Sequence, residues 1–306
     1  MQKTEAKRFS KSVKAKLGRP AFLSRRDLDI LKYIWRWKIA ATASIHESIN
    51  RPESPYSTSK VLEKLEKNDF IECRFDCVER FNVWQLTSRG FQSLKTYLGE
   101  LIEDGYLSEN HRHDRLVQAL QLGDWATFPN PRVVHCTEQE MRRKDVVHYP
   151  EWVPKTKEHR ADGYTRIIGA KKPWTIAYEV ELSAKSIQRY EAIIRFYGSV
   201  RQIDRVIWLV ETDFVRDQIL RAKTCVRDET TNYHLFVTLN EFSQSGWDAM
   251  VINECSKSLG TIREITQGFC GDPAGDFLGK LRGHSGLTVH LTPQKILGKN
   301  RKIYAL

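Results

Sequence analysis

The chain has 306 residues, of which 41% are hydrophobic and 28% charged, and its formal net charge is +11. A chain of this length can build two domains with real cores, and its positive charge favours a polyanionic partner, most simply nucleic acid. A basic protein without such a partner stays open as the alternative. No run approaches the roughly 18 apolar residues of a membrane span. The basic N-terminus also lacks the apolar core of a signal peptide, so we expect a cytoplasmic protein with no membrane partner.

The first 20 residues form a strongly basic segment. They carry seven lysines and arginines against one acid, Glu5, and little apolar content. We expect residues 1–20 to be a disordered arm that can lie on phosphates. A plain solubilising tail would have the same composition.

Residues 21–100 carry the pattern of a small helical domain with two strands. Apolar residues at helical spacing follow Ser24, which can cap the first helix. The elements expected in this stretch are helices from Ser24, from Thr42 and from near Ser57, strands at 71–75 and 82–86, and a closing helix from Ser88.

This order of elements resembles a winged helix-turn-helix, and residues 61–71 are similar to the third helix and first wing strand of many such domains. The resemblance implies that the third helix enters the major groove of double-stranded DNA. A winged helix that binds another protein is the alternative, because Glu63 and Glu66 lie on the same helix. The residues expected to contact DNA are Thr58, Lys60, Lys64 and Lys67 on the helix, and Arg80 in the loop between the strands.

Residues 110–250 predict an α/β sheet with crossover helices. A helix opened by His113 and a short strand at 132–135 come first. The nearly continuous apolar run at 203–210 is typical of a strand covered on both faces. A helix at 213–225 and a strand at 233–238 repeat the alternation. The pattern fades beyond Ser243, and we treat residues 251–306 as a C-terminal extension.

The candidate chemistry lies between His159 and Tyr197. Alternation along the strand that ends at Leu182 places Glu179 and Glu181 on one face. Two neighbouring carboxylates repel each other unless a cation lies between them, and a divalent metal with oxygen ligands meets that need. Asp162 precedes a strand-like run, and a turn near residues 169–173 predicts a hairpin that brings it to the same metal.

The helix after this strand is expected to begin at Ser183, which can cap it. That start places Lys185 in the first turn, near the end of the strand. Gln188 and Arg189 lie on one face of the same helix and are expected to contact DNA. The run His111-Arg112-His113 hints at the histidine pair of rolling-circle relaxases, but no strand surrounds it, and we expect only a polar helix start.

The acids and the lysine resemble the site of the PD-(D/E)xK nuclease superfamily, which has an Asp before a hairpin and an acid-x-Lys on the next strand. The resemblance implies that Asp162 and Glu179 bind Mg²⁺ or Mn²⁺, which activates a water molecule, while Lys185 orients that water or stabilises developing charge. Glu181 stands where the superfamily has its lysine, so Lys185 would be a migrated lysine. Either Glu138 or Glu140 would be the additional upstream acid that binds the metal.

A longer pattern is similar to the replication-relaxation family, which includes MobC-type plasmid mobilisation relaxases. It consists of a winged helix, then Asp162-Gly163, Glu179-x-Glu181-x-Ser183-x-Lys185 and Arg189-Tyr190. The resemblance implies a mixed α/β chain, α+β overall, with a winged helix followed by a restriction-endonuclease-like domain. It also implies an origin of transfer or replication as target, single-stranded DNA as a further partner, and other mobilisation or replication proteins.

Two functions remain open at this point. The first is a metal-dependent DNA-nicking enzyme of a mobile element, which the acids at 162, 179 and 181 motivate. The second is a non-catalytic origin-binding initiator or transcriptional repressor on an inactive nuclease fold. The absence of a lysine at position 181 motivates the second hypothesis.

Overall fold

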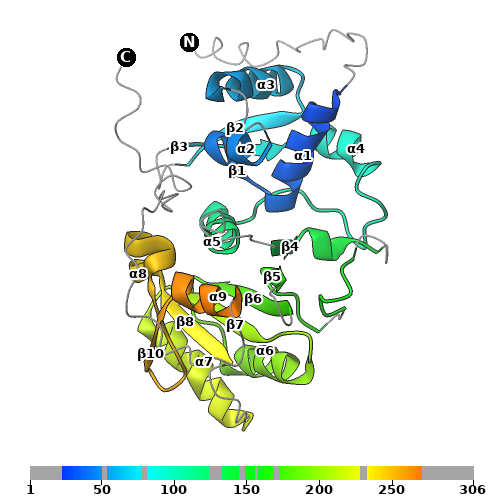
Figure 1. Ribbon diagram of the computed structural model, residues 1–306. Coiled ribbons are helices and arrows are strands. Elements are labelled where there is room, and N and C mark those ends of the chain that lie inside the picture. Colours follow the sequence, from blue (N-terminus) through cyan, green and yellow to red (C-terminus); the bar gives the residue numbers. More distant parts are fainter. Residues whose placement is uncertain are drawn as a thin grey trace, which may run out of the picture.

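A computed structural model describes residues 23–49, 54–76, 81–123, 133–144, 149–155, 158–168, 173–227 and 233–270. Within these ranges the chain forms an N-terminal unit of helices with a small sheet, and a larger α/β unit (Figure 1). The basic arm at 1–20, Arg80 and the segment 271–306 lie outside the described residues. None of the described helices is long and apolar enough to cross a membrane.

The N-terminal unit contains the helices and the two strands that the sequence predicts. Its three-stranded antiparallel sheet has the order β1-β3-β2, and the first of these strands is a two-residue element that periodicity does not reveal. The elements are α1 (Arg25–Trp37), β1 (Ala40–Ala41), α2 (Thr42–Ile49), α3 (Pro55–Lys67), β2 (Ile71–Asp76), β3 (Phe81–Leu86) and α4 (Ser88–Lys95).

Helix α1 begins at a capping box and packs its apolar face inwards. The Ser24 side chain accepts from the Asp27 amide, and the Asp27 side chain accepts from the Ser24 amide, which satisfies two amides that the helix itself leaves free. Leu31 and Trp35 lie in the core of this unit, against side chains from α3 and α4.

The α/β unit is built on a seven-stranded sheet with the order β10-β9-β8-β7-β6-β5-β4. Strands β4, β5 and β6 pair antiparallel, β6, β7 and β8 pair parallel, and β9 and β10 return antiparallel. The strands are β4 (Val133–Thr137), β5 (Gly163–Ile168), β6 (Pro173–Glu181), β7 (Arg205–Val210), β8 (His234–Thr238), β9 (Met250–Ile252) and β10 (Ser258–Thr261).

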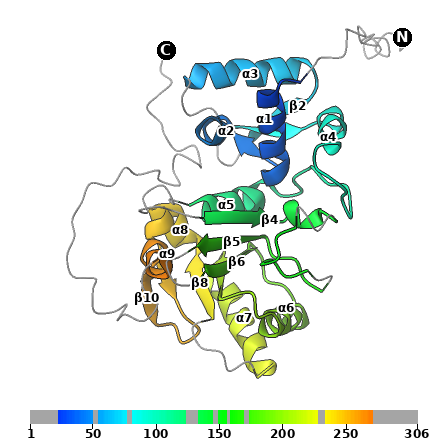
Figure 2. The same cartoon turned by 45° about the vertical axis from the view of Figure 1, so that its right-hand side comes forward.

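Helices cover both faces of this sheet (Figures 1 and 2). On one face α5 (His111–Leu122), α8 (Leu239–Ser245) and α9 (Ile262–Cys270) pack on the sheet, and on the other face α6 (Ile187–Ser199) and α7 (Asp213–Cys225) do. Short 3-10 turns, η2 (Glu140–Arg142) and η3 (Gly246–Asp248), complete the unit. The expected α/β sheet with crossover helices is therefore present.

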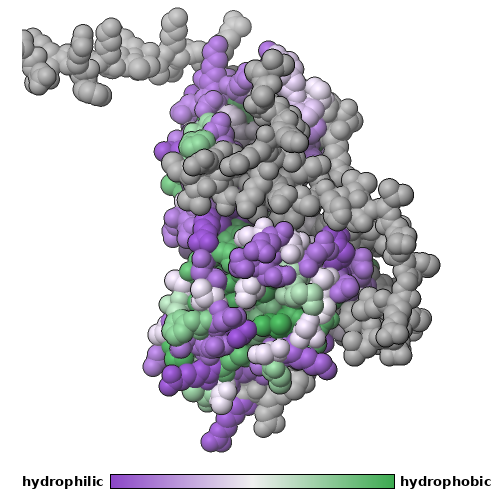
Figure 3. Space-filling model, turned by 90° about the vertical axis from the view of Figure 1, so that its left-hand side faces the viewer, coloured by the Kyte–Doolittle hydropathy of each residue, from purple (hydrophilic) through white to green (hydrophobic). Residues whose placement is uncertain are grey.

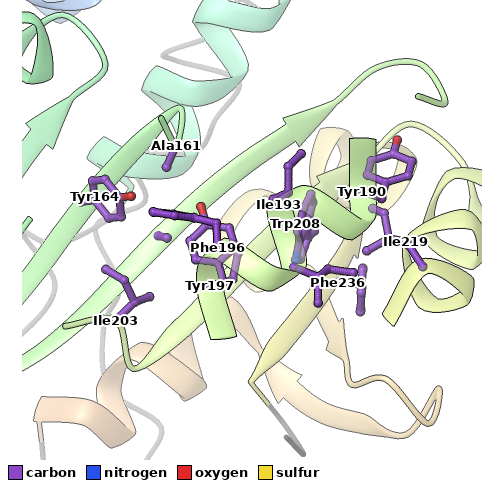
Figure 4. Close-up of a cluster of buried hydrophobic side chains, with 14 of the residues drawn as sticks. Ala161, Tyr164, Tyr190, Ile193, Phe196, Tyr197, Ile203, Trp208, Ile219 and Phe236 are labelled. Carbon is purple, nitrogen blue, oxygen red and sulfur yellow. The ribbon is translucent and has the colours of Figure 1, made fainter. Parts of the chain in front are cut away.

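The two faces of β6 follow the expected alternation. Tyr178 and Val180 join the core under α5, whereas Ala177 joins the core under α6 and α7. Figure 4 shows the second of these cores, in which Tyr197 of α6 lies near Phe196 and Trp208. Glu179 and Glu181 alternate with Tyr178 and Val180, so they share the face that α6 covers.

Two details differ from the sequence expectations. Ser186, not Ser183, caps α6, because its side chain accepts from the Arg189 amide, so Lys185 lies in the loop before the helix instead of its first turn. The sheet also continues past residue 250 through β9 and β10, strands of three and four residues that are too short to show alternation. On the face in Figure 3, apolar residues gather over the α/β unit, whereas the described part of the N-terminal unit is mostly hydrophilic there.

Candidate functional site

Three carboxylates come together where β5 begins and β6 ends. The Asp162 amide donates to the Tyr178 carbonyl at 3.1 Å, and Asp162 Oδ2 accepts from the Val180 amide at 2.7 Å. These bonds fix Asp162 against the last residues of β6, beside Glu179 and Glu181. The two glutamates are 3% and 2% exposed, so the predicted hairpin does bring three acids into one buried region.

Each of these acids is paired with a basic side chain. His113 Nε2 lies 3.3 Å from Asp162 Oδ2, and Lys185 Nζ donates to Glu181 Oε1 at 2.6 Å. Glu179 is paired with His159. Basic partners are required here, because neighbouring buried carboxylates cannot all remain charged without compensation.

Glu179 is held by two groups through one oxygen. His159 Nε2 lies 2.6 Å from Glu179 Oε1, and the Tyr197 hydroxyl donates to the same oxygen. Burial would lower the pKa of His159, but Glu179 outweighs this effect and raises it. Glu179 therefore favours the protonated form of His159.

The charges of the cluster shift several pKa values. Burial raises the pKa of Glu181 to about 7; Lys185 opposes this shift, and Glu179 and Asp162 add to it. Burial would raise the pKa of Asp162 as well, but the charge of His113 holds it below its usual value. Burial would lower the pKa of His113, yet Asp162 and Asp114 raise it to about 10. His113 is thus a protonated imidazolium at neutral pH.

The carboxylate oxygens of this cluster are of the kind that bind a divalent metal, but their arrangement is not that of a metal site. Mg²⁺ is commonly bound by one or two carboxylates together with substrate phosphates and water, and Asp162 and Glu179 could supply such oxygens. Among the described residues, however, no group of three or more His, Cys, Asp or Glu side chains is arranged to hold a metal ion. The basic partners His113, His159 and Lys185 already supply positive charge beside these acids.

The two predicted upstream acids face the N-terminal unit. Glu140 Oε2 lies 2.9 Å from Arg36 Nε and accepts from the Thr137 amide at 3.0 Å. Glu138 lies 2.6 Å from Lys38 Nζ and 3.0 Å from an Arg142 nitrogen. Their basic partners on α1 and at its end are about a hundred residues away in sequence, so the resemblance that implied metal ligands here could not reveal these pairs.

Glu138 still lies near the acid cluster. It lines a small cavity of about 20 Å³ together with Asp162, Lys38 and His113. Its contacts with Lys38 and Arg142 nevertheless give it a structural role at the junction of the two units. The structure records no hydrogen bond or ion pair between Glu138 or Glu140 and either Asp162 or Glu179.

The start of α6 borders the carboxylates on the solvent side. Lys185, Gln188 and Arg189 are exposed there, and 42% of the Lys185 side chain is accessible although its amine binds Glu181. These three predicted residues are thus placed where a phosphate backbone could approach the acids. The catalytic role of Lys185 and the DNA contacts of Gln188 and Arg189 remain predictions.

The predicted DNA-contacting residues of α3 differ in how far they are exposed. Thr58 is fully buried and its hydroxyl lies 2.9 Å from His46 Nδ1, so it does not face a ligand. Lys64 binds Asp27 at 2.8 Å and is half exposed. Lys60 and Lys67 are exposed, and the Lys60 amine lies 5.0 Å from the centre of the Tyr56 ring.

Sequence reasoning missed His113, His159 and Tyr197 as members of the site. A signal for His113 was present, because it precedes Leu116 and Val117 by three and four residues and so shares the apolar face of α5 that packs on the sheet. A histidine on that face must meet a polar partner. The contacts of His159 and Tyr197 with Glu179 depend on how α6 packs on β6, which no local pattern shows.

Comparison with known proteins assigns this chain to no family. No family model matches the chain, and no curated protein matches it. The structure of the restriction endonuclease FokI aligns with 72% of this chain and 43% of its own length, at 11% sequence identity and a TM-score of 0.24. The chain thus spans less than half of that protein, and a likeness this weak carries no argument about shared activity.

Proposed function

We propose that this protein binds duplex DNA through its N-terminal unit and cuts one strand at the carboxylate cluster with the help of a divalent metal. The observation that carries the proposal is the convergence of Asp162, Glu179 and Glu181 at one buried place, with Lys185 at its exposed edge. The helix α5, the hairpin β5-β6 and the acids on β6 follow the chain order of the PD-(D/E)xK nucleases that the sequence resembles.

We assign the N-terminal unit as a winged helix. Supporting this assignment, the order α1-β1-α2-α3-β2-β3 ends in a two-stranded hairpin, and β1 pairs with β3 to complete a small antiparallel sheet. Helix α3 then acts as the recognition helix. Its exposed Lys60 and Lys67 contact the phosphate backbone, whereas the buried Thr58 does not.

In this proposal Asp162 and Glu179 hold Mg²⁺ or Mn²⁺. The bound metal would lower the pKa of a water molecule and neutralise charge on the scissile phosphate. Lys185 sits at the exposed edge of the cluster and can place its positive charge next to that phosphate. Arg189 and Gln188, exposed at the start of α6, position the DNA strand. His113 and His159 hold the two acids in place.

The DNA target follows from the resemblance to the replication-relaxation family. On that basis we assign an origin of transfer or replication of a mobile element, with mobilisation or replication proteins as partners. The order of the motifs between Asp162 and Tyr190 supports this assignment.

The test is a nicking assay on supercoiled plasmid that carries the element's own origin, with Mn²⁺. The wild-type protein should convert supercoiled plasmid to open circles, and Asp162→Asn and Glu179→Gln should each lower the rate at least about a hundredfold. Asp217→Asn is the matched control, because Asp217 is an exposed acid of α7 that contacts Arg216, and it should nick like the wild type. A wild-type protein that does not nick, or an Asp162→Asn variant that nicks equally well, overturns the enzymatic proposal.

A second candidate is a DNA-binding initiator or repressor without catalysis. The specific observation in its favour is that every acid of the cluster already has a basic partner, and that no described group of side chains is arranged to hold a metal. Calorimetry separates the two functions. Uptake of Mn²⁺ by the wild type that Asp162→Asn abolishes supports the nuclease, whereas sequence-specific DNA binding without any metal uptake supports the binding protein.

A further inference from the structure

A chain of charged side chains connects the N-terminal unit to the carboxylate cluster. Lys38 Nζ lies 3.1 Å from Asp114 Oδ1, and the same oxygen lies 3.2 Å from His113 Nδ1. The other nitrogen of His113, Nε2, lies 3.3 Å from Asp162 Oδ2. Three contacts therefore lead from the residue that ends α1 to the acid that begins the predicted active site.

These groups are shielded from water. The accessible fractions of the side chains are 16% for Lys38, 8% for Asp114 and 24% for His113. Charge pairs that are partly buried are screened less than surface pairs, so each contact influences the next one more strongly. Burial would lower the pKa of Lys38, but the carboxylates of Asp114 and Glu138 raise it, so this lysine is a cation throughout the physiological range.

The backbone at Lys38 gives independent support for a role of its side chain. Lys38 has a φ of +62° at the C-terminal end of α1. Glycine is the residue that takes this conformation without steric cost, whereas a residue with a side chain is strained there. The strained turn directs the chain from α1 into β1 while the Lys38 amine reaches Asp114 and Glu138 on the other unit.

The two units are also joined by contacts that do not involve Lys38. Arg36 donates to the His135 carbonyl at 2.8 Å and binds Glu140. Gln118 of α5 donates to the Tyr33 hydroxyl at 3.2 Å. Loss of Lys38 would therefore leave the units in contact, and its distinctive contribution is the connection through Asp114 to His113.

We propose that Lys38 is a positioning residue of the nuclease site, which acts on Asp162 through Asp114 and His113. The proposal rests on the function proposed above and deepens it, because the DNA-binding unit supplies a residue that completes the site. Lys38 and His113 share one oxygen of Asp114. Without Lys38, the carboxylate of Asp114 attracts His113 alone, and the imidazole moves away from Asp162.

The first test does not depend on nicking. Lys38→Gly suits the positive φ and removes the amine, and Asp162→Asn is nearly isosteric, so both variants should fold. The structure records no direct contact between Lys38 and Asp162. If they were also not connected through Asp114 and His113, each substitution would change the equilibrium constant of unfolding by the same factor whether or not the other is present. We expect the double variant to deviate from the product of the single effects by about threefold or more. Arg36→Met is the matched control and should combine with Asp162→Asn multiplicatively.

The second test uses the nicking reaction. Lys38→Gly should lower kcat at least about tenfold while KM and DNA affinity stay within twofold, and Lys38→Arg should restore part of the loss. The proposal is overturned if the effects of Lys38→Gly and Asp162→Asn on the unfolding equilibrium constant simply multiply in the double variant. It is also overturned if Lys38→Gly leaves kcat unchanged. If the wild-type protein does not nick, the proposed function fails, and the unfolding experiment alone then decides whether Lys38 is coupled to Asp162.

Discussion

At the scale of single residues, Glu181 shows how a carboxylate can resist ionisation in a charged site. It is 2% exposed, and burial raises its pKa to about 7 even though Lys185 lies 2.6 Å away. The lysine is half exposed to water and only partly offsets the burial of the acid. Glu181 is therefore protonated over a wider pH range than a surface glutamate, unlike Asp162 beside it.

This shift predicts a pH-dependent effect of Glu181→Gln on stability. The folded state binds the proton more tightly than the unfolded state, whose pKa is near 4.5. The stability from this group is fully present below pH 4.5 and is lost as the pH rises through 7. Relative to Glu181→Gln, the wild type should thus lose up to about 3 kcal/mol of unfolding free energy between pH 4.5 and 8. Urea unfolding at several pH values measures this difference.

A second variant sharpens the measurement. Lys185→Met removes the charge that opposes the shift, so in this background the decline with pH should become larger and extend to higher pH. A difference between the wild type and Glu181→Gln that does not change with pH would show that Glu181 ionises normally.

At the scale of elements, Gly163 sets the contact between α5 and the hairpin that carries the site. A Cβ atom at this position would lie 2.3 Å from Gln121 Oε1. Gln121 is fully buried on α5 and donates to the Tyr164 carbonyl at 2.6 Å and to the Cys136 carbonyl at 3.2 Å. The side chain therefore joins α5 to both β4 and β5, and it has no room to move aside freely.

Gly163→Ala should displace this amide and destabilise the protein by about 1 to 3 kcal/mol. Gly198→Ala is the matched control, because a Cβ there meets nothing within 4 Å and the position lies in α6. Since alanine favours helix over glycine, the control should stabilise by up to about 1 kcal/mol. Thermal and urea unfolding measure both effects, and equal changes in the two variants would contradict the role assigned to Gly163.

The elements differ in how far local sequence determines them. The apolar pattern predicted β6 by its alternation and β7 by its nearly continuous apolar run, because both strands bury these side chains under helices. Strands β1, β9 and β10 have two to four residues and show no period, so only pairing with a longer strand reveals them.

The candidate site also has a part that local sequence predicts and a part that it does not. Strand alternation placed Glu179 and Glu181 on one face, and the hairpin brought Asp162 to them. The basic partners of these acids, and the contacts of Glu138 and Glu140 with the N-terminal unit, depend on side chains up to about a hundred residues apart. Such contacts follow from the way α1, α5 and α6 pack, which no local pattern determines.

At the scale of the whole molecule, most of the net charge of +11 lies in the two terminal segments: residues 1–20 carry seven lysines and arginines against one acid, and residues 271–306 carry six against two. Figures 1 and 2 both show α3 at the end of the N-terminal unit that faces away from the large sheet. The carboxylates, by contrast, lie near the junction, where α5 meets the start of β5. DNA bound to α3 as proposed would therefore be separated from the cluster, so the lysines of α3 should affect affinity and not the chemical step.

The double variant Lys60→Ala/Lys67→Ala tests this division. Each lysine that neutralises a phosphate adds about 0.9 to the slope of log affinity against log salt, so the variant should bind DNA more weakly and with a slope reduced by about 2. Its kcat at saturating DNA should stay unchanged. Fluorescence anisotropy at several salt concentrations measures the slope.

Lys144→Ala is the matched control, since Lys144 is an exposed lysine of the second unit that binds Glu100 at 2.6 Å, and its affinity and slope should equal those of the wild type. If the control loses as much affinity as the double variant, the positive charge acts as a whole and α3 is not the recognition helix. If affinity does not respond to salt at all, phosphate contacts do not hold this protein on its ligand, and nucleic acid ceases to be its partner.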